Sequence, residues 1–267
     1  MECTVSPGEP EQMGRIEIRV AHTPTDSALI AELFDQVWDV KSMVSPEIIT
    51  ASVHNGGYGS VVYIESGNDI ASGNMLRPVG ASFALVGKSL PGCTGPNLHS
   101  HAAGVLPEMV GKGIGAMIKR HQWDWAKENG FETITWTFDP LVRRNAHFNL
   151  IKLGATVLGY HQNFYGELDD GINAGEQSDR VLVRWNVAGV DEPQANTFVE
   201  PSNTAVVIET PADIEQLRKT DRVQSDGWRT RQRAAFETAR LGGLRVVGLN
   251  QDFSYVLDVA AETNGVL

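Results

Sequence analysis

Three glycines occupy alternate positions, Gly111, Gly113 and Gly115, between an apolar segment and a helix-like pattern. Because glycine has no Cβ, such a loop lets the backbone come close to a ligand. The amide hydrogens of a helix's first turn have no partner inside the helix, and together with the helix dipole they attract anions. Lys112 adds a positive charge. We therefore predict a diphosphate-binding loop, with the candidate contact residues Val110, Gly111, Lys112, Gly113, Ile114, Gly115 and Ala116.

Two cofactors use such a loop, and a third interpretation is a turn without a ligand. Gly111-x-Gly113-x-x-Ala116 matches the Gly/Ala form of the dinucleotide fingerprint, and Asp139 follows at about the right distance for a ribose contact. In a dinucleotide-binding unit, however, an apolar strand runs directly into the first glycine. Here a polar His-Ser-His segment and then residues 106–110 (LPEMV) come before it. This context favours a coenzyme A diphosphate, with the cofactor held between two strands that splay apart.

His99 and His101 alternate on one face of the strand-like segment before the loop. Acylation of an amine needs a group that takes the proton of the attacking nitrogen, and an imidazole suits this near neutral pH. His101 is our candidate base because it is nearer to the expected carbonyl position, and Glu108 competes with it. The ordinary alternatives are a buried histidine bonded to a neighbouring strand and a solvated carboxylate.

Further candidates follow the loop in the sequence. Tyr165, in the Phe-Tyr-Gly segment at 164–166, is a candidate acid for a departing thiolate, as are Tyr160 and His147. Core packing is the ordinary alternative for a tyrosine. Guanidinium groups pair with carboxylates through two hydrogen bonds. The candidate acceptor contacts are Trp136 and Phe138 on one strand face, Asp139 for an ammonium group, and Arg180, Arg143 and Arg144 for a carboxylate.

The surrounding sequence predicts the elements that position these residues. Strand patterns occur at 16–20, 60–64, 80–86, 98–105, 131–138, 155–160 and 180–187, and a terminal hairpin at 244–249 and 253–259. Thr25 or Asp26 can cap a helix, Ser45 caps a second, and further helices follow the glycine loop and begin at Asn145. The helix after the loop carries Ile114, Met117, Ile118, His121 and Trp125 at helical spacing. This order predicts an α/β (α+β) chain with a mixed sheet and helices on both faces.

The chain divides into three predicted parts. Residues 1–14 form a flexible lead, 15–187 the main domain, and 188–267 a small α/β extension packed on or beside it. In the extension, an arginine-rich segment follows Trp228. An exposed helix face is the expected place for Arg229, Arg231 and Arg233.

Composition narrows the classes of function. The 267 residues carry a net charge of −11, which argues against nucleic acid or an anionic membrane as a broad partner. Cys3 and Cys93 have no metal-ligand spacing, so we expect free thiols and no metal. The first residues lack a signal-peptide pattern, and no apolar run approaches the ~18 residues of a membrane span. A cytoplasmic location is therefore expected.

At the glycine loop the chain resembles the GNAT superfamily, whose motif is Gln/Arg-x-x-Gly-x-Gly/Ala. Gly113 and Gly115 fall on the two small positions, while Val110 replaces Gln or Arg. The strings LHSHAAGVLPEMVGKGIG, TWTFDPLVRRNAHFNLIKLGA, FYG and DRVLVRW are similar to a branch of predicted acyltransferases in that superfamily. The resemblance covers about residues 15–187, and it is weaker in the tail.

This resemblance implies a GNAT fold, with a twisted, mostly antiparallel mixed sheet, and an acyl-CoA co-substrate. It implies that Gly104 and Val105 bind the pantetheine arm, that residues 110–116 hold the diphosphate, and that Asn145 contacts the cofactor. The family's usual tyrosine acid is missing, because Leu150 stands at its position.

We therefore predict an acyl-CoA-dependent N-acyltransferase that moves an acetyl or succinyl group to a small amine such as an amino acid. Attack would be direct, in a ternary complex. A succinyl donor would require a cationic residue near the acyl end. The alternatives are a non-catalytic acyl-CoA sensor and, less favoured, an NAD-dependent oxidoreductase. Candidate partners are the small-molecule amine and a second copy of the chain in a homodimer.

Overall fold

The fold is built around a seven-stranded sheet with one parallel neighbouring pair. The computed structural model describes residues 14–66, 75–166 and 177–259. Among these residues the strand order is β1-β2-β3-β4-β5-β7-β6, and every neighbouring pair except β4–β5 is antiparallel. The predicted mixed, mostly antiparallel sheet is confirmed, whereas the lead predicted at 1–14 lies, apart from Gly14, outside the described residues. The strands are β1 (Ile16–Val20), β2 (Tyr58–Ser66), β3 (Met75–Gly87), β4 (Asn97–Val105), β5 (Thr133–Phe138), β6 (Thr156–His161) and β7 (Arg180–Asn186).

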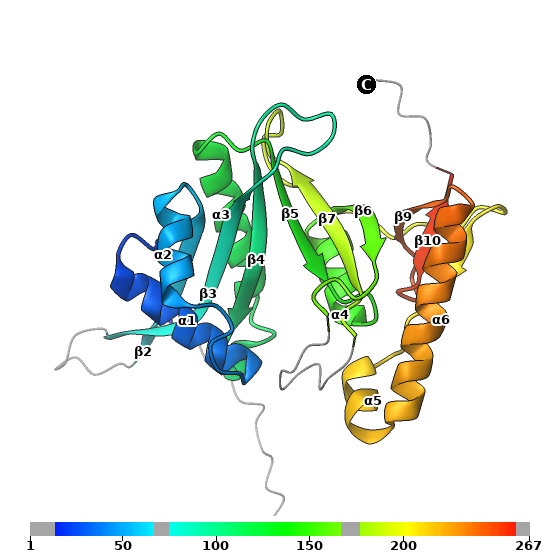
Figure 1. Ribbon diagram of the computed structural model, residues 1–267, viewed down its shortest axis with the longest axis horizontal. Coiled ribbons are helices and arrows are strands. Elements are labelled where there is room, and N and C mark those ends of the chain that lie inside the picture. The colour runs from blue at the N-terminus through cyan, green and yellow to red at the C-terminus, as the bar shows by residue number, and fades with distance from the viewer. Residues whose placement is uncertain (1–13, 67–74, 167–176, 260–267) are drawn as a thin grey trace, which may run out of the picture.

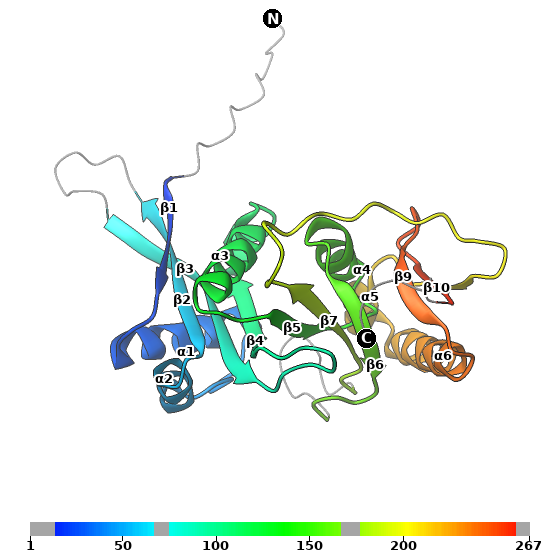
Figure 2. The ribbon, with the colours of Figure 1, turned by 90° about the horizontal axis from the view of Figure 1, so that it is seen from above.

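Helices cover both faces of the sheet, as predicted. Figure 2 shows α1 and α2 on one side, and α3 and α4 on the other. Thr23 is the N-cap of α1, in place of the predicted Thr25 or Asp26. The reason is that Pro24 suits the first helical position, and Asp26 then completes a capping box with Thr23. The helices are α1 (Pro24–Trp38), α2 (Pro46–His54), α3 (Ile114–Glu128) and α4 (Arg143–Ala146), which continues as a π-helix at His147–Lys152.

Strands β4 and β5 pair over three residues and then part. The pairing ends at His99 opposite Thr135. Beyond this point β4 follows β3 and β5 follows β7, so the two strands diverge (Figure 1). A β-bulge adds His101 to β4 where it pairs with β3, and bulges bend and twist a strand. A wedge therefore separates the second halves of β4 and β5, with the backbone edges of both strands facing it.

Helix α3 joins the two halves of the sheet. Its side chains Ile114 and Ile118 belong to the apolar core under α1 and α2. Trp123 and Ala126 belong to a second core, with β5 and β7, and the Trp123 indole donates to the Asn186 carbonyl at 3.0 Å. Each large apolar side chain buried in this way contributes about 1.5–3 kcal/mol. The helix therefore sets how the halves meet on either side of the wedge.

Residues 188–259 form a smaller unit against the β6–β7 end of the sheet (Figure 2). The predicted hairpin is confirmed as the antiparallel β9–β10 pair. The ring of Phe236 stacks on Tyr160 at a centroid distance of 4.5 Å, and the Tyr255 hydroxyl donates to the Pro140 carbonyl at 3.0 Å. The unit shares the core of β5 and β7. Its elements are β8 (Val206–Ile208), α5 (Ile214–Thr220), α6 (Arg222–Leu241), β9 (Arg245–Leu249) and β10 (Tyr255–Asp258), with strand order β8-β10-β9.

Two buried carboxylates at this contact receive arginines from α5 and α6. Asp139, just after β5, accepts hydrogen bonds from Arg229 at 2.8 and 2.9 Å and from Arg218 at 2.5 Å. Asp179, just before β7, pairs with Arg233 at 2.6 Å. The expected exposed face is therefore wrong for Arg229, which is buried, and for Arg233, which is half-buried.

Asp139→Asn should lower the free energy of unfolding by about 3–5 kcal/mol, because two buried guanidinium groups lose their counter-charge. Burial alone would raise the pKa of Asp139, but Arg229 and Arg218 hold it well below its usual range. This stabilisation is present above the unfolded-state pKa of about 3.9 and is lost as pH falls below it. Urea unfolding measures the change. Asp124→Asn, in an exposed pair with Arg120, should cost less than about 1 kcal/mol, and equal losses would contradict the assignment.

Candidate functional site

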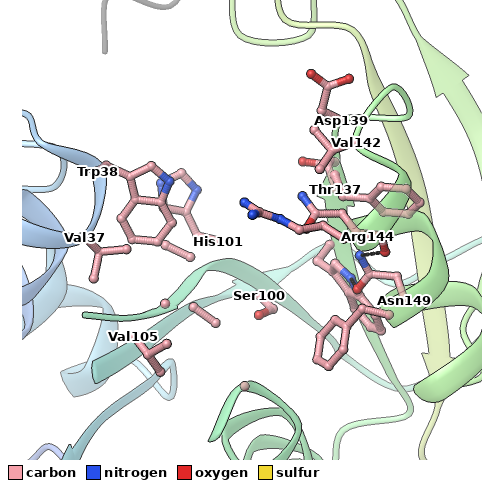
Figure 3. Close-up of a pocket in the computed structure, with 18 of the residues that line it drawn as sticks. Val37, Trp38, Ser100, His101, Val105, Thr137, Asp139, Val142, Arg144 and Asn149 are labelled. Atoms are coloured by element: carbon pink, nitrogen blue, oxygen red, sulfur yellow. Dashed lines mark hydrogen bonds between the residues drawn. The ribbon is translucent and has the colours of Figure 1, made fainter. Parts of the chain in front are cut away.

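The wedge between β4 and β5 opens into a cavity of about 820 Å³, a size within the range of small-molecule sites. Its walls come from the end of α1, from β4 and β5, from the first turns of α3, and from α4 with the π-helix. Figure 3 shows Trp38 and His101 on one side of the gap, Thr137 and Asn149 on the other, and Ser100 between them.

The predicted glycine loop leads into the N-terminus of α3 at this cavity. Gly111 and Gly113 have φ values of +85° and +82°, which glycine adopts without strain. A Cβ added at either position would meet no atom within 4 Å. In the described part of the chain, the amide hydrogens of Gly113, Ile114 and Gly115 donate to no protein acceptor. Open space and a free first turn on a long helix are what a bound diphosphate requires.

The other loop residues contribute differently. Val110 and Ala116 donate their amides to carbonyls three residues earlier, so their amides are already engaged. The Ile114 side chain is buried in the core and offers a ligand only its amide. The Lys112 ammonium lies 3.9 Å from the Met109 sulfur, in the loop. The candidate diphosphate contacts are therefore reduced from residues 110–116 to residues 111–115. Val110 lines the cavity wall.

The geometry disfavours the dinucleotide alternative. Strand β4 ends at Val105, and a short 3-10 turn at Pro107–Met109 separates it from Gly111. A dinucleotide loop instead continues directly from its strand. The sheet here is also mostly antiparallel, whereas dinucleotide-binding sheets are mostly parallel.

Asp139 lines the cavity wall but is engaged by the protein itself. A carboxylate has about four acceptor sites, and four donors fill them. Two come from Arg229, one from Arg218 and one from the Leu141 amide at 3.0 Å. The prediction that Asp139 binds an acceptor ammonium therefore requires correction, since its oxygens hold arginines of the extension. The same occupancy argues against a ribose contact.

The β4 edge that was predicted to hold the pantetheine arm faces the wedge. Gly104 and Val105 pair with β3 on one side and line the cavity on the other. Gly104 must be glycine for a packing reason, because a Cβ there would lie 2.7 Å from Val37 and 2.9 Å from Trp38. Helix α1 therefore packs directly on the edge that the cofactor would follow.

The favoured base and acid candidates, His101 and Tyr165, lie together on the cavity wall. Their ring centroids are 6.4 Å apart, and the Tyr165 hydroxyl is 3.2 Å from that of Thr137. Burial lowers the pKa of His101, which favours the neutral imidazole that a base requires. His99 instead bonds the Thr135 hydroxyl at 3.1 Å, the ordinary alternative that the sequence left open.

Three other proton-transfer candidates lie outside the cavity lining. The Glu108 side chain is 55% exposed and pairs with Arg77 at 3.0 Å, so the geometry does not support it as the base. Tyr160 donates its hydroxyl to Asp179. The ring of His147 packs against two phenylalanines of the extension. Tyr160 and His147 thus belong to the contact with the extension.

Two asparagines, Asn145 of α4 and Asn149 of the π-helix, line the cavity. Asn149 accepts from the Trp136 indole at 2.8 Å and donates to the Asn145 carbonyl at 2.8 Å, which holds the indole in place. The predicted residues Asn145, Trp136 and Phe138 all line the cavity. Leu150 points into the apolar core. π-Helices are frequent at functional sites, and this one places Asn149 at the cavity wall.

Of the predicted carboxylate clamps, Arg180 has the most suitable position. It lines the cavity, with its guanidinium carbon 5.7 Å from the Tyr165 ring centre and one nitrogen bonded to the Asp179 carbonyl at 2.9 Å. Arg143 and Arg144 bond groups of the extension. Arg180 remains our candidate for an acceptor carboxylate.

Lys119 of α3 lines the cavity, although the sequence pattern did not identify it. Its side chain is 5% exposed. The ammonium donates to the Ser100 hydroxyl and the Gln122 amide oxygen, each at 3.0 Å, and lies 3.8 Å from the Trp136 ring centre. It forms no ion pair within the described residues. Burial lowers its pKa to about 7.

A signal for Lys119 was present in the sequence. The pattern placed Met117 in the apolar stripe of α3, but Met117 is 42% exposed. The buried face runs through Ile118, Lys119, Gln122, Trp123 and Ala126. Lysines are ordinarily exposed to solvent. The sequence pattern therefore assigned Lys119 to the exposed face and predicted the wrong buried face for α3.

No protein-family model and no curated protein matches the sequence. Among solved structures, the ribosomal-protein-S18-alanine N-acetyltransferase of Escherichia coli matches 67% of this chain and 97% of its own at 13% identity, with a TM-score of 0.48. The yncA protein of Salmonella typhimurium, with acetyl-CoA, matches 68% and 99% at 18% identity, with a TM-score of 0.47. The phosphinothricin acetyltransferase of Sinorhizobium meliloti, a GNAT superfamily member in complex with acetyl-CoA, matches 70% and 97% at 14%, with a TM-score of 0.47. Likeness at this level transfers no residue role.

Two kinds of feature are absent from the described residues. No helix there is both long and apolar enough to cross a membrane. No cluster of three or more His, Cys, Asp or Glu side chains in that part of the chain is arranged to hold a metal ion.

His101 should titrate below the ordinary histidine range, with a midpoint under about 6.5. Because burial lowers the folded-state pKa, protonation destabilises the fold as pH falls through this range. NMR of ring-labelled histidine measures the midpoint, with the resonance assigned from the His101→Gln variant. A midpoint at or above 6.5 would show that the ring is hydrated or faces an anion.

Proposed function

We propose that this chain is an acyl-CoA-dependent N-acyltransferase that moves an acetyl or succinyl group to the amine of a small molecule such as an amino acid. One observation carries the proposal. A wedge between two parted strands leads to the first turn of α3, where the amide hydrogens of Gly113, Ile114 and Gly115 donate to no acceptor in the described part of the chain. An extended pantetheine arm suits the wedge, and a diphosphate suits the free turn.

Two groups of residues would divide the chemistry. On the β4 edge, backbone amides at the wedge are the candidate donors to the oxyanion that forms when the amine attacks. His101 is the candidate proton acceptor for the attacking nitrogen, because its imidazole is neutral and at the cavity wall. Attack would be direct, and no covalent enzyme intermediate is invoked.

The cavity also favours an acceptor that carries a carboxylate. Arg180 lies beside Tyr165, near His101. A guanidinium can hold a carboxylate through two hydrogen bonds and thereby place a neighbouring amine close to the base. An amino acid combines these two groups, which supports it as the acceptor class.

Acetyl-CoA and succinyl-CoA should each raise the melting temperature of the wild-type protein, and Gly113→Val should abolish the rise. A β-branched side chain cannot adopt φ near +82° without strain, and it would occupy the open space at the loop. Gly92→Val is the matched control, because Gly92 has φ +80°, nothing within 4 Å of an added Cβ, and no place in the cavity lining. If both variants keep the shift, the loop is misplaced.

Thiol release from the same acyl-CoAs, assayed with a panel of amino acids and polyamines, separates an enzyme from a sensor. Turnover with an amine supports the transferase. Binding without turnover across the panel favours the sensor. Stabilisation by NAD but not by coenzyme A would overturn both.

A further inference from the structure

Lys119 lies at the apex of the wedge. The β4–β5 pairing ends at His99 and Thr135, so Ser100 and Trp136 are the first residues after the strands part. The Lys119 ammonium contacts both, at 3.0 Å from the Ser100 hydroxyl and 3.8 Å from the Trp136 ring centre. The lysine therefore lies where the narrow end of the cavity meets α3.

The groups around this ammonium are almost all neutral. Gln122 of α3, Ser100 of β4, Trp136 of β5 and the Trp185 ring of β7, at 5.8 Å, face it. The nearby titratable group is His99, whose pKa is lowered to about 4, first by burial and then by the charges of His101 and Lys119. No carboxylate among the described residues pairs with it. Asp139 differs in this respect, because its buried carboxylate forms ion pairs with two arginines.

A buried charge without a counter-charge is costly for a folded protein. Such a site gains most from a ligand that brings a negative charge or accepts a proton. In thioester aminolysis, one group in the ligand becomes negative only as the reaction proceeds, namely the departing sulfur.

We propose that Lys119, hydrogen-bonded to Ser100, donates the proton taken up by the thiolate that leaves the acyl-CoA. This inference rests on the proposed function. It assigns the acid role to Lys119 in place of the sequence candidate Tyr165. Lys119 lies on α3, the helix whose first turn would hold the diphosphate of the same molecule.

The amine nitrogen bonds to the carbonyl carbon, the carbon–sulfur bond breaks, and its electron pair stays on sulfur. A proton moves from the Lys119 nitrogen to sulfur, which gives the free thiol and a neutral lysine. The proton lost by the attacking nitrogen leaves by way of His101 to solvent, and Lys119 takes a proton back from solvent before the next turnover.

The position of Lys119 separates the two proton transfers. His101 contacts Phe83 and Tyr165, whereas Lys119 contacts Ser100 and Gln122. The base and the acid therefore come from different elements, β4 and α3, and have different contacts. A lysine with its pKa lowered to about 7 by burial is also a better acid near neutral pH than an ordinary lysine.

The test compares the binding of coenzyme A and desulfo-coenzyme A, which differ only at the sulfur, by calorimetry at pH 6, where Lys119 carries its proton. In the wild type, coenzyme A should bind about tenfold more tightly, because a charge-assisted hydrogen bond from the ammonium to the sulfur is worth roughly a factor of ten. In Lys119→Met the ratio should fall to about one. Lys88→Met, which removes an exposed lysine remote from the cavity lining, should keep the wild-type ratio.

Turnover gives a second readout once an acceptor amine is known. Lys119→Met should lower kcat about 100-fold. It should also remove the loss of rate that the wild type shows as pH rises above about 7, where Lys119 loses its proton.

The outcomes separate the two proposals. If neither coenzyme A nor its desulfo form binds, the proposed function fails. If both bind the wild type equally, the cavity binds the cofactor but Lys119 does not act on sulfur, and the inference is overturned. An effect of Lys119→Met on succinyl-CoA alone would also overturn it, because the lysine would then hold the acyl carboxylate. A wild-type ratio near one overturns the inference even if the variant does not fold.

Discussion

The parting of β4 from β5 is the constraint on which the rest of the structure depends. Two parallel strands that remain paired leave no room for a ligand between them, since their backbone groups satisfy each other. Here pairing stops at His99 and Thr135, and each strand is held by its other neighbour. The bulge at His101 bends β4 at the same point. The cost of two unpaired edges is kept local, because β3 and β7 hold the remaining backbone groups of both strands.

Structures on both sides keep the wedge open. Helix α3 crosses from one apolar core to the other, with Ile118 in the first and Trp123 in the second. On the β5 side, α5 and α6 supply arginines to Asp139 and Asp179, which flank β5 and β7. The extension therefore braces one wall of the cavity and is more than an appended unit. Its residues Glu215 and Arg218 also reach the cavity lining.

The buried charges fall into two kinds. Asp139 is surrounded by donors, and its surroundings satisfy it completely. Lys119 is surrounded by hydroxyl, amide and aromatic groups, and its surroundings leave its charge without an opposite charge among the described residues. A protein gains stability from the first arrangement and reactivity from the second, because a poorly compensated charge responds strongly to whatever enters the site.

The sequence alone determined the features that depend on local chemistry. The strands, the helices and the glycine loop could be predicted, because periodicity and glycine's conformational freedom are local properties. Only the tertiary structure decided which side chains those elements bring together. Asp139 and Arg229 are ninety positions apart, and no spacing rule links them. Lys119 was hidden for a related reason. Helical periodicity predicts which face of a helix is buried, but it does not show which polar side chains the neighbouring sheet can accept there. Lys119 can be buried because Ser100 and Gln122 are positioned to accept its hydrogen bonds.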